Sequence, residues 1–146
     1  ATTTFGGLTQ NVSLRELDLS RSHLAHGAVS HLSSGLGDNR GLETIKFEQC
    51  FMADDEMTEV VDSVYDHPTI KHLNFCQNNA HSSALEAIAD LLESDECSLE
   101  TLDLSHQLLC GDKEELDLPC LAKAVGALHD NTSLKKLNIS NNRFSD

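Results

Sequence analysis

The amino-acid sequence predicts an α/β fold, a right-handed solenoid whose parallel strands line a concave face and whose helices cover a convex face. The first observation behind this prediction is a pattern, apolar-x-x-apolar-x-apolar, that occurs five times within 146 residues. The second is a helical spacing of apolar residues between successive occurrences. Repetition at a period of roughly 20 to 50 residues is typical of stacked units that bury their apolar faces against each other.

Each occurrence of the apolar pattern predicts one short strand. Alternation of apolar and polar residues, as in Leu17-Asp18-Leu19, places apolar side chains on one face of a strand and polar side chains on the other. The first positions of successive patterns lie 28, 28, 29 and 35 residues apart. The five patterns are Leu14/Leu17/Leu19, Leu42/Ile45/Phe47, Ile70/Leu73/Phe75, Leu99/Leu102/Leu104 and Leu134/Leu137/Ile139.

A polar or thiol residue follows each strand pattern at the same offset, and an apolar residue comes two positions later. The polar side chain is expected to bond backbone groups of the turn, which stacking would otherwise bury without partners. We therefore interpret Cys50 as a turn residue and not as a reactive thiol. The polar series is Ser22, Cys50, Asn78, Gln107 and Asn142, and the apolar series is Leu24, Met52, Ala80, Leu109 and Phe144.

Between the strand patterns, apolar residues follow the spacing of a helix face, which predicts one helix in each of the first four units. The acids Asp54–Glu56, and Ser82-Ser83 with Glu86, are expected to cap the second and third helices. A crossover of this length between parallel strands should be right-handed. The predicted core positions are Ala28, Val29 and Leu32; Met57, Val60, Val61 and Val64; Leu85, Ile88, Ala89 and Leu92; and Leu121, Ala122, Val125 and Leu128.

The combined pattern, L-x-x-L-x-L-x-x-N/C-x-L, resembles the leucine-rich repeat over essentially the whole chain. Units of about 28 residues with a full helix are similar to the ribonuclease-inhibitor type, shared by ribonuclease inhibitor, the Ran GTPase-activating protein and nucleotide-binding immune receptors. The resemblance implies one domain over residues 1–146, with about four full repeats and a partial repeat at each end. Because Leu8–Leu14 aligns with Leu128–Leu134, we expect the chain to be part of a longer array.

Composition and charge argue against several classes of function. The chain has 24 acidic and 10 basic side chains and a formal net charge of −14, which disfavours nucleic acid and anionic membranes as partners. No apolar run reaches the roughly 18 to 20 residues of a membrane span. The five cysteines lack CxxC spacing, so we expect no metal site and a reducing, cytoplasmic location. No catalytic or phosphate-binding signature is present, so no enzyme activity and no cofactor are expected.

The sequence therefore favours a non-enzymatic protein–protein interaction scaffold that binds a protein partner through the concave strand face and the loop around residues 110–118. This loop contains the extra residues of the fourth unit, and insertions in repeats often collect on the binding face. The candidate partner-binding residues are Glu16, Asp18, Lys46, Glu48, His72, Asn74, Asp103, Glu114, Glu115 and Lys136.

Several alternatives stay open at this level. The resemblance also allows a GTPase-activating regulator similar to the Ran GTPase-activating protein, or the ligand-sensing repeat region of an immune receptor. The outward strand positions include no large aromatic residue of the kind that anchors interfaces, so such anchors lie in other repeats or this face has only a structural role. The loop around residues 110–118 is either a contact with the partner or tolerated variation of a surface loop. Residues 53–117 carry 17 acids against Lys71 and Lys113, forming either a solubility surface or a docking site for a basic partner. The oligomeric state is not indicated.

Overall fold

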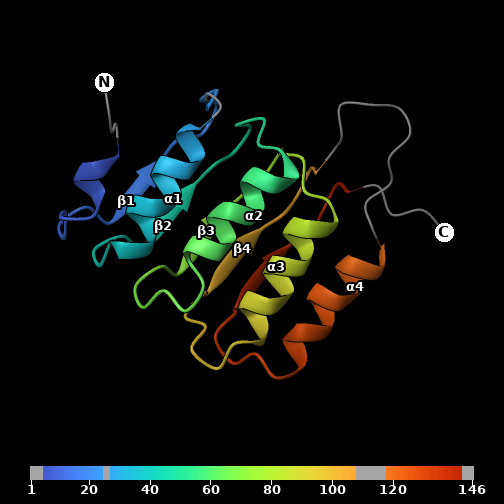
Figure 1. The fold of residues 1–146 in the computed structure, drawn as a ribbon. Helices are drawn as coiled ribbons and strands as arrows, with labels where there is room; N and C mark the ends of the chain where they lie inside the picture. Colours follow the sequence, from blue (N-terminus) through green and yellow to red (C-terminus); the bar gives the residue numbers. More distant parts are fainter. Residues whose placement is uncertain (1–4, 25–26, 108–117, 143–146) are drawn as a thin grey trace.

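The computed structural model describes residues 5–24, 27–107 and 118–142. In this part of the chain, five parallel strands form one sheet and four α-helices lie beside it, which confirms the predicted α/β class (Figure 1). None of the described helices is long and apolar enough to span a membrane, and the longest has 12 residues. The elements are η1 (Gly6–Leu8), β1 (Glu16–Asp18), α1 (Ala28–Asp38), β2 (Thr44–Lys46), α2 (Asp54–Ser63), β3 (His72–Asn74), α3 (Ser82–Glu93), β4 (Thr101–Asp103), α4 (Leu118–Gly126), η2 (Ala127–His129) and β5 (Lys136–Asn138).

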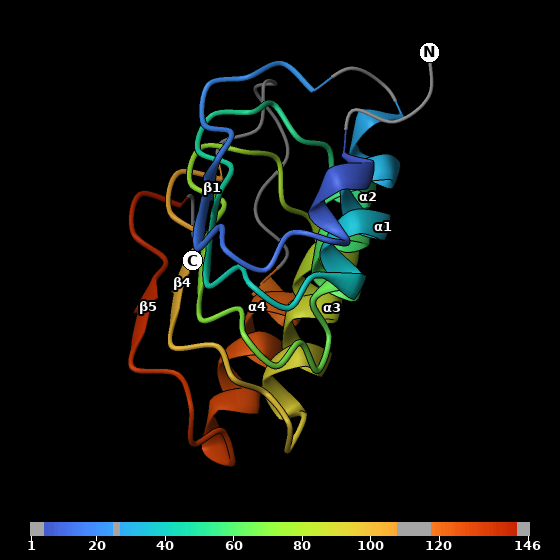
Figure 2. The ribbon, with the colours of Figure 1, turned by 90° about the vertical axis from the view of Figure 1, so that its left-hand side faces the viewer.

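The order of the strands in the sheet follows the chain, β1-β2-β3-β4-β5. Figure 2 shows the resulting two layers from the side, with the strands in one layer and the helices in the other. Each strand pairs with the next so that equivalent repeat positions are direct neighbours. The first residues of the strands, Glu16, Thr44, His72, Thr101 and Lys136, therefore form one continuous row across the sheet.

The core lies between the sheet and the helices and contains most of the predicted apolar positions. The middle residues of β2, β3 and β4 are at most 2% exposed, whereas those of β1 and β5 are partly buried, because among the described residues each outer strand has a neighbour on one side. Phenylalanines of adjacent units, two residues further along the chain, stack with ring centroids 5.5 Å apart. These residues are Ile45, Leu73 and Leu102 in the inner strands, Leu17 and Leu137 in the outer strands, and the stacked pair Phe47 and Phe75.

All predicted helical core positions of the second and third units are buried, including Val64, which follows the last turn of α2. In the first unit, α1 buries Val29 and Leu32. In the fourth unit the prediction is wrong for Ala122 and Val125, which are exposed. The buried positions there are Leu121, Ala124 and Ala127, spaced three residues apart along one side of the helix. The two small alanine side chains allow close packing of this segment against the neighbouring helix.

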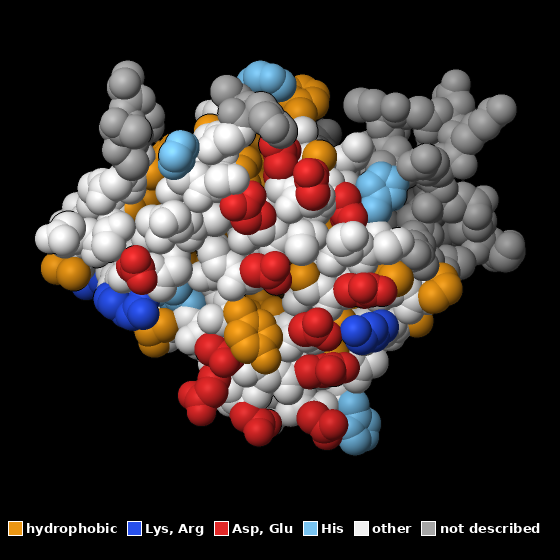
Figure 3. All heavy atoms as spheres, viewed as in Figure 1, with side chains coloured by type: hydrophobic (Ala, Val, Ile, Leu, Met, Phe, Trp, Pro, Cys, Tyr) orange, Lys and Arg blue, Asp and Glu red, His pale blue; other side chains and the backbone are white. Residues whose placement is uncertain are grey.

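The acids at the start of α2 cap two helices. Glu56 Oε2 accepts the backbone N–H of Ala53 at 2.9 Å, as the sequence predicts. Asp54 instead reaches the next unit, where its carboxylate accepts the N–H groups of His81 at 2.6 Å and of Ser83 and Ala84 at 3.0 Å. The N-terminus of α3 is therefore capped by a side chain of the preceding unit, which the sequence analysis did not predict. Other carboxylates spread over the outward sides of α2 and α3 (Figure 3).

Side chains at the turn after the strands bond backbone groups of two adjacent units. Asn78 Oδ1 accepts the N–H groups of Cys50 at 3.2 Å and Met52 at 3.0 Å, and its Nδ2 donates to the carbonyls of Phe47 at 2.7 Å and Phe75 at 3.0 Å. We call the series Cys50, Asn78, Gln107 and Asn142 the turn ladder, because Gln107 and Asn142 bond in the same manner.

Cys50 takes the amide's place in the second unit. Its thiol donates to the carbonyl of Leu19 at 3.1 Å, and the side chain is buried. Burial is the main cause that raises the pKa of the Cys50 thiol above its ordinary value. A buried, protonated thiol is a poor nucleophile, which agrees with its interpretation as a turn residue.

A second series, which we call the loop ladder, lies three residues before each strand pattern. Asn39 Oδ1 accepts the N–H groups of Gly41 at 2.8 Å and Leu42 at 2.7 Å. Its Nδ2 donates back to the preceding unit, to the carbonyls of Leu8 at 2.6 Å and Asn11 at 2.8 Å. The loop ladder consists of Asn11, Asn39, His67 and Asn131.

His67 replaces asparagine in the third unit of the loop ladder. Its Nδ1 accepts the N–H groups of Thr69 and Ile70, both at 3.3 Å, and its Nε2 donates to the carbonyl of Leu36 at 3.1 Å. These neighbours favour the neutral ring with its proton on Nε2, because a proton on Nδ1 would face two donors. Burial is the main cause that lowers the pKa of His67, and the charge of Arg40 adds to it, while the bond to Leu36 opposes it.

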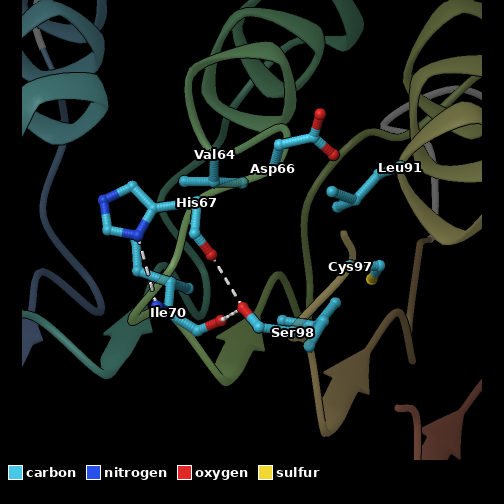
Figure 4. Close-up of a pocket in the computed structure, with 8 residues that line it drawn as sticks. Val64, Asp66, His67, Ile70, Leu91, Cys97 and Ser98 are labelled. Carbon is cyan, nitrogen blue, oxygen red and sulfur yellow. Dashed lines mark hydrogen bonds between the residues drawn. The ribbon is translucent and has the colours of Figure 1, made fainter. Parts of the chain in front are cut away.

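In the fourth unit, Glu96 stands at the loop-ladder position, and a serine takes over part of the bonding. Ser98 Oγ donates to the carbonyls of His67 at 2.7 Å and Ile70 at 3.0 Å, as Figure 4 shows. A cavity of about 10 Å³ remains beside these groups, lined by residues such as Val64 and Leu99. A space of this size is at the lower limit for one water molecule, so it is a packing defect and not a ligand site.

One residue in every unit, directly before the turn-ladder position, has a left-handed backbone conformation. Glycine is absent from these positions, and asparagine occurs once, so the composition did not indicate a left-handed turn. In the first four units, the backbone N–H of this residue donates to a carbonyl of the next unit, which holds the chain in this conformation. The five residues are Arg21, Gln49, Gln77, His106 and Asn141, with φ between 55° and 62°.

Replacement of a central ladder leucine should destabilise the whole array. Leu102 is 1% exposed in β4, and Leu102→Ala should lower the free energy of unfolding by about 2 to 5 kcal/mol through lost burial and the cavity left behind. Chemical denaturation measures this value. Leu14→Ala is the matched control, because Leu14 is 38% exposed and the same truncation should cost less than half as much. Equal losses in the two variants would contradict the core position of Leu102.

The loop-ladder histidine should make stability depend on pH. Because the folded-state pKa of His67 is lowered, the unfolded chain binds its proton first as pH falls through about 6.5, and stability is lost below that value. His67→Asn restores the ladder amide and removes the titrating ring. We expect its unfolding free energy to fall less than that of the parent chain between about pH 7.5 and 5.5, by up to about 1 kcal/mol. His31→Asn changes an exposed histidine and should follow the parent chain.

Candidate functional site

The polar side chains of the five strands form the candidate site, which we call the strand face. It is the side of the sheet opposite the helices, and it has two rows of side chains in register across the strands. The sequence-predicted positions of β1–β5 all fall in these rows. The first row is Glu16, Thr44, His72, Thr101 and Lys136, and the second row is Asp18, Lys46, Asn74, Asp103 and Asn138.

A depression of about 210 Å³ lies on the strand face over β2 to β5. Half of the ten predicted contact residues line it, so the fold brings together side chains from units far apart in the sequence. Thr44, Thr101 and Asn138 complete its polar wall. The predicted residues in the lining are Lys46, His72, Asn74, Asp103 and Lys136.

The other predicted residues lie outside this depression. Glu16 and Asp18 are on β1, at the edge of the described sheet, and Glu48 follows the end of β2. Glu48 Oε1 is 3.8 Å from Arg21 Nη2, an exposed pair that contributes little to stability. Glu114 and Glu115, with the rest of the loop around 110–118 up to residue 117, lie outside the described residues.

The second row has a structural task that the sequence analysis missed. In four of the five strands, an Asp or Asn side chain accepts the backbone N–H of the residue two positions later, where the chain leaves the strand. A recurring D/N-x-S/C triplet was the available signal, since short polar side chains favour such local bonds. The bonds run from Ser20 to Asp18 at 2.9 Å, Cys76 to Asn74 at 2.8 Å, Ser105 to Asp103 at 2.9 Å and Ser140 to Asn138 at 3.1 Å.

These bonds also affect the charge of the face. The side-chain and backbone hydrogen bonds from Ser20 lower the pKa of the exposed Asp18 carboxyl below its ordinary value. Lys46 occupies the second-row position of β2, and its Nζ lies 2.6 Å from Glu16 Oε1. That bond is the main cause that raises the pKa of Lys46. Asp18 and Lys46 are therefore both charged at neutral pH.

The side chains of the first row make fewer hydrogen bonds to the backbone than those of the second row. His72 Nδ1 and Thr101 Oγ1 are 2.9 Å apart, so this ring is held by a neighbouring strand. Lys136 is exposed on β5 and lines the depression. The face thus combines acidic, basic and neutral polar groups over a shallow surface, which suits polar contacts with another protein.

Two observations on the described residues concern metal binding and thiol chemistry. Among the described residues, no group of three or more His, Cys, Asp or Glu side chains is arranged to hold a metal ion. Cys76 lies just beyond the second row, where its sulfur accepts a hydrogen bond from Ser105 Oγ at 3.3 Å. Burial is the main cause that raises the pKa of Cys76, which disfavours the thiolate that a nucleophile requires.

Comparison with known sequences points to repeats of one class. The sequence model of the family described as Leucine Rich Repeat matches residues 133–146. The mouse (Mus musculus) protein named "NACHT, LRR and PYD domains-containing protein 4C" is 27% identical over 143 residues, which is 97% of this chain. The chain spans 14% of the length of that relative.

Comparison with solved structures agrees on the fold. The tropomodulin C-terminal domain of Caenorhabditis elegans superposes with a TM-score of 0.76 at 17% identity, covering 99% of this chain and 85% of that domain. A structure described as Leiomodin-1 Actin-Binding Site 2 has a TM-score of 0.77 at 18% identity, covering 100% of this chain and 83% of its own. At this level of identity the likeness concerns the fold alone. The five sequence repeats, their strand–helix units and the family match together support the leucine-rich repeat expected from the sequence.

Proposed function

We propose that this chain is a non-enzymatic scaffold that binds a protein partner through the strand face. The observation that carries the proposal is the depression on that face, where charged and polar side chains of four strands converge. Its floor is rigid because backbone hydrogen bonds join every strand to the next. A shallow, open and preorganised surface fits a protein better than a small molecule, which prefers an enclosed pocket.

The finer features expected from the sequence belong to this proposal. Units of about 28 residues with a full helix support the ribonuclease-inhibitor type and a right-handed solenoid whose concave side is the strand face. The loop around 110–118 is proposed as a second contact beside that face. A cytoplasmic location stays a prediction from cysteine usage.

A second candidate function is a repeat segment of a larger receptor that senses a ligand. The observation in its favour is the match along 97% of this chain to a protein whose name includes NACHT and PYD domains. In that case the strand face would serve the same binding role within a longer array. The GTPase-activating alternative rests on the repeat type alone, since none of the relatives reported above carries that activity in its name.

The folding role of one residue in the depression, Asn74, can be tested by itself. Asn74→Asp retains the oxygen that accepts the Cys76 N–H and adds a charge to the surface, so its unfolding free energy should stay within about 0.5 kcal/mol of the parent chain. Asn74→Ala removes the acceptor and should cost about 1 kcal/mol. Thermal and urea denaturation measure both variants. If Asn74→Ala were as stable as the parent chain, the bond to Cys76 would contribute nothing to the free energy of unfolding.

The partner can be trapped by photo-cross-linking from the strand face. A benzophenone side chain at position 136 should cross-link a partner in cell extract, whereas the same group at Val125, which is 42% exposed on α4, should not. With the identified partner purified, Lys136→Ala should weaken binding by about tenfold. Lys135→Ala removes the same charge from the adjacent residue, which does not line the depression, and should weaken binding by less than about twofold. Equal effects of the two lysine variants would contradict the proposed surface.

A further inference from the structure

The helix side of the molecule has a groove of its own, distinct from the strand face. It lies between the C-terminal ends of α2 and α3, and its volume is about 400 Å³. Figure 3 shows this side of the molecule, where acidic side chains gather over both helices, and blue basic side chains lie at the left edge and beside the acids at lower right. The lining residues are Asp62, Tyr65, Ala87, Asp90, Glu93 and Ser94.

The charges around this groove oppose the dipoles of both helices. The C-terminal end of a helix carries partial negative charge and normally favours Lys or Arg. The last turns of α2 and α3 contain no basic residue and instead carry Asp62, Asp90 and Glu93. Carboxylates at these places destabilise the free molecule slightly, and a bound cation would remove that cost.

One of these carboxylates already binds a cation from the neighbouring helix. Lys123 of α4 places its Nζ 3.2 Å from Asp90 Oδ1. That bond is the main cause that raises the pKa of Lys123, and the charges of Glu86 and Glu93 add to it. Among the described residues, Asp62 and Glu93 have no ion pair of this kind.

An aromatic ring completes the groove. Tyr65 lies two residues after the end of α2, and 49% of its surface is exposed although the residue is large and partly apolar. Ala87, which is 8% exposed, leaves space between the helices where a longer side chain would fill it. An exposed tyrosine ring beside carboxylates is the arrangement that binds a planar cation, by stacking on the ring and by paired hydrogen bonds to the acids.

We propose that this groove is a docking site for an arginine-containing basic segment of a protein partner. One guanidinium group stacks on Tyr65 and bonds Asp62 or Glu93, and further basic residues of the segment meet the remaining acids of α2 and α3. Arginine fits better than lysine because its planar group stacks on the ring and donates two parallel hydrogen bonds. The sign of the charge excludes nucleic acid phosphates and anionic lipids from this site.

The experiment measures binding of a fluorescently labelled hexa-arginine peptide to the 146-residue chain by anisotropy at low ionic strength. Hexaglutamine is the neutral control peptide. Asp62→Asn combined with Glu93→Gln should weaken hexa-arginine binding by about tenfold. The control pair Asp38→Asn with Asp130→Asn removes the same two charges outside the groove, at residues that are also exposed, and should weaken it by less than about threefold.

Substitutions of Tyr65 separate the groove from a general attraction between opposite charges. Tyr65→Ala leaves the net charge unchanged and should weaken binding by about threefold, whereas Tyr65→Phe retains the ring face and should bind as the parent chain does. Circular dichroism melting curves establish that each variant is folded. Absence of hexa-arginine binding, equal losses in the two charge pairs, or no effect of Tyr65→Ala in a folded variant would each overturn the proposal.

Discussion

The constraint on which the structure depends is the bonding of backbone groups that stacking buries. When units with the same turn lie on each other, the N–H and carbonyl groups of every turn lose contact with water and need partners. The turn ladder meets this need, as Asn78 shows with bonds to both its own unit and the preceding one. An amide is suited to this task because it donates and accepts at the same time. The ladder therefore aligns the units, and the strands pair in register as a consequence.

Alignment of the units also decides which surface residues meet. The register places equivalent positions side by side, so the strand face is built from one or two side chains per unit. Its second row is partly committed to the backbone, because Asp18, Asn74 and Asp103 bond the chain where it leaves each strand. The first row has fewer such bonds. A binding surface in this fold can therefore vary most freely in its first row without loss of local structure.

The two sides of the molecule present different electrostatics. The strand face mixes acids with lysines, and pairs such as Glu16 with Lys46 balance each other locally. The helices α2 and α3 carry acids without Lys or Arg, and two of these acids serve as helix caps, Glu56 for α2 and Asp54 for α3. Eight of the 24 acids of the chain are on these two helices, and they give the helix side a negative surface. The two proposed sites therefore differ in the charge of the partner that each would bind.

The sequence by itself determined the repeats, the five strands and the side-chain series of the turn, because stacked units impose a periodic pattern of burial on the chain. It also indicated most of the residues on the strand face. Three features were decided by the tertiary structure alone: the cap that Asp54 provides to α3, the hydrogen bonds that His67 makes in place of asparagine, and the orientation of α4. These features depend on which atoms of adjacent units come within bonding distance. Local propensity and periodicity describe one unit at a time, so they carry no information about such contacts.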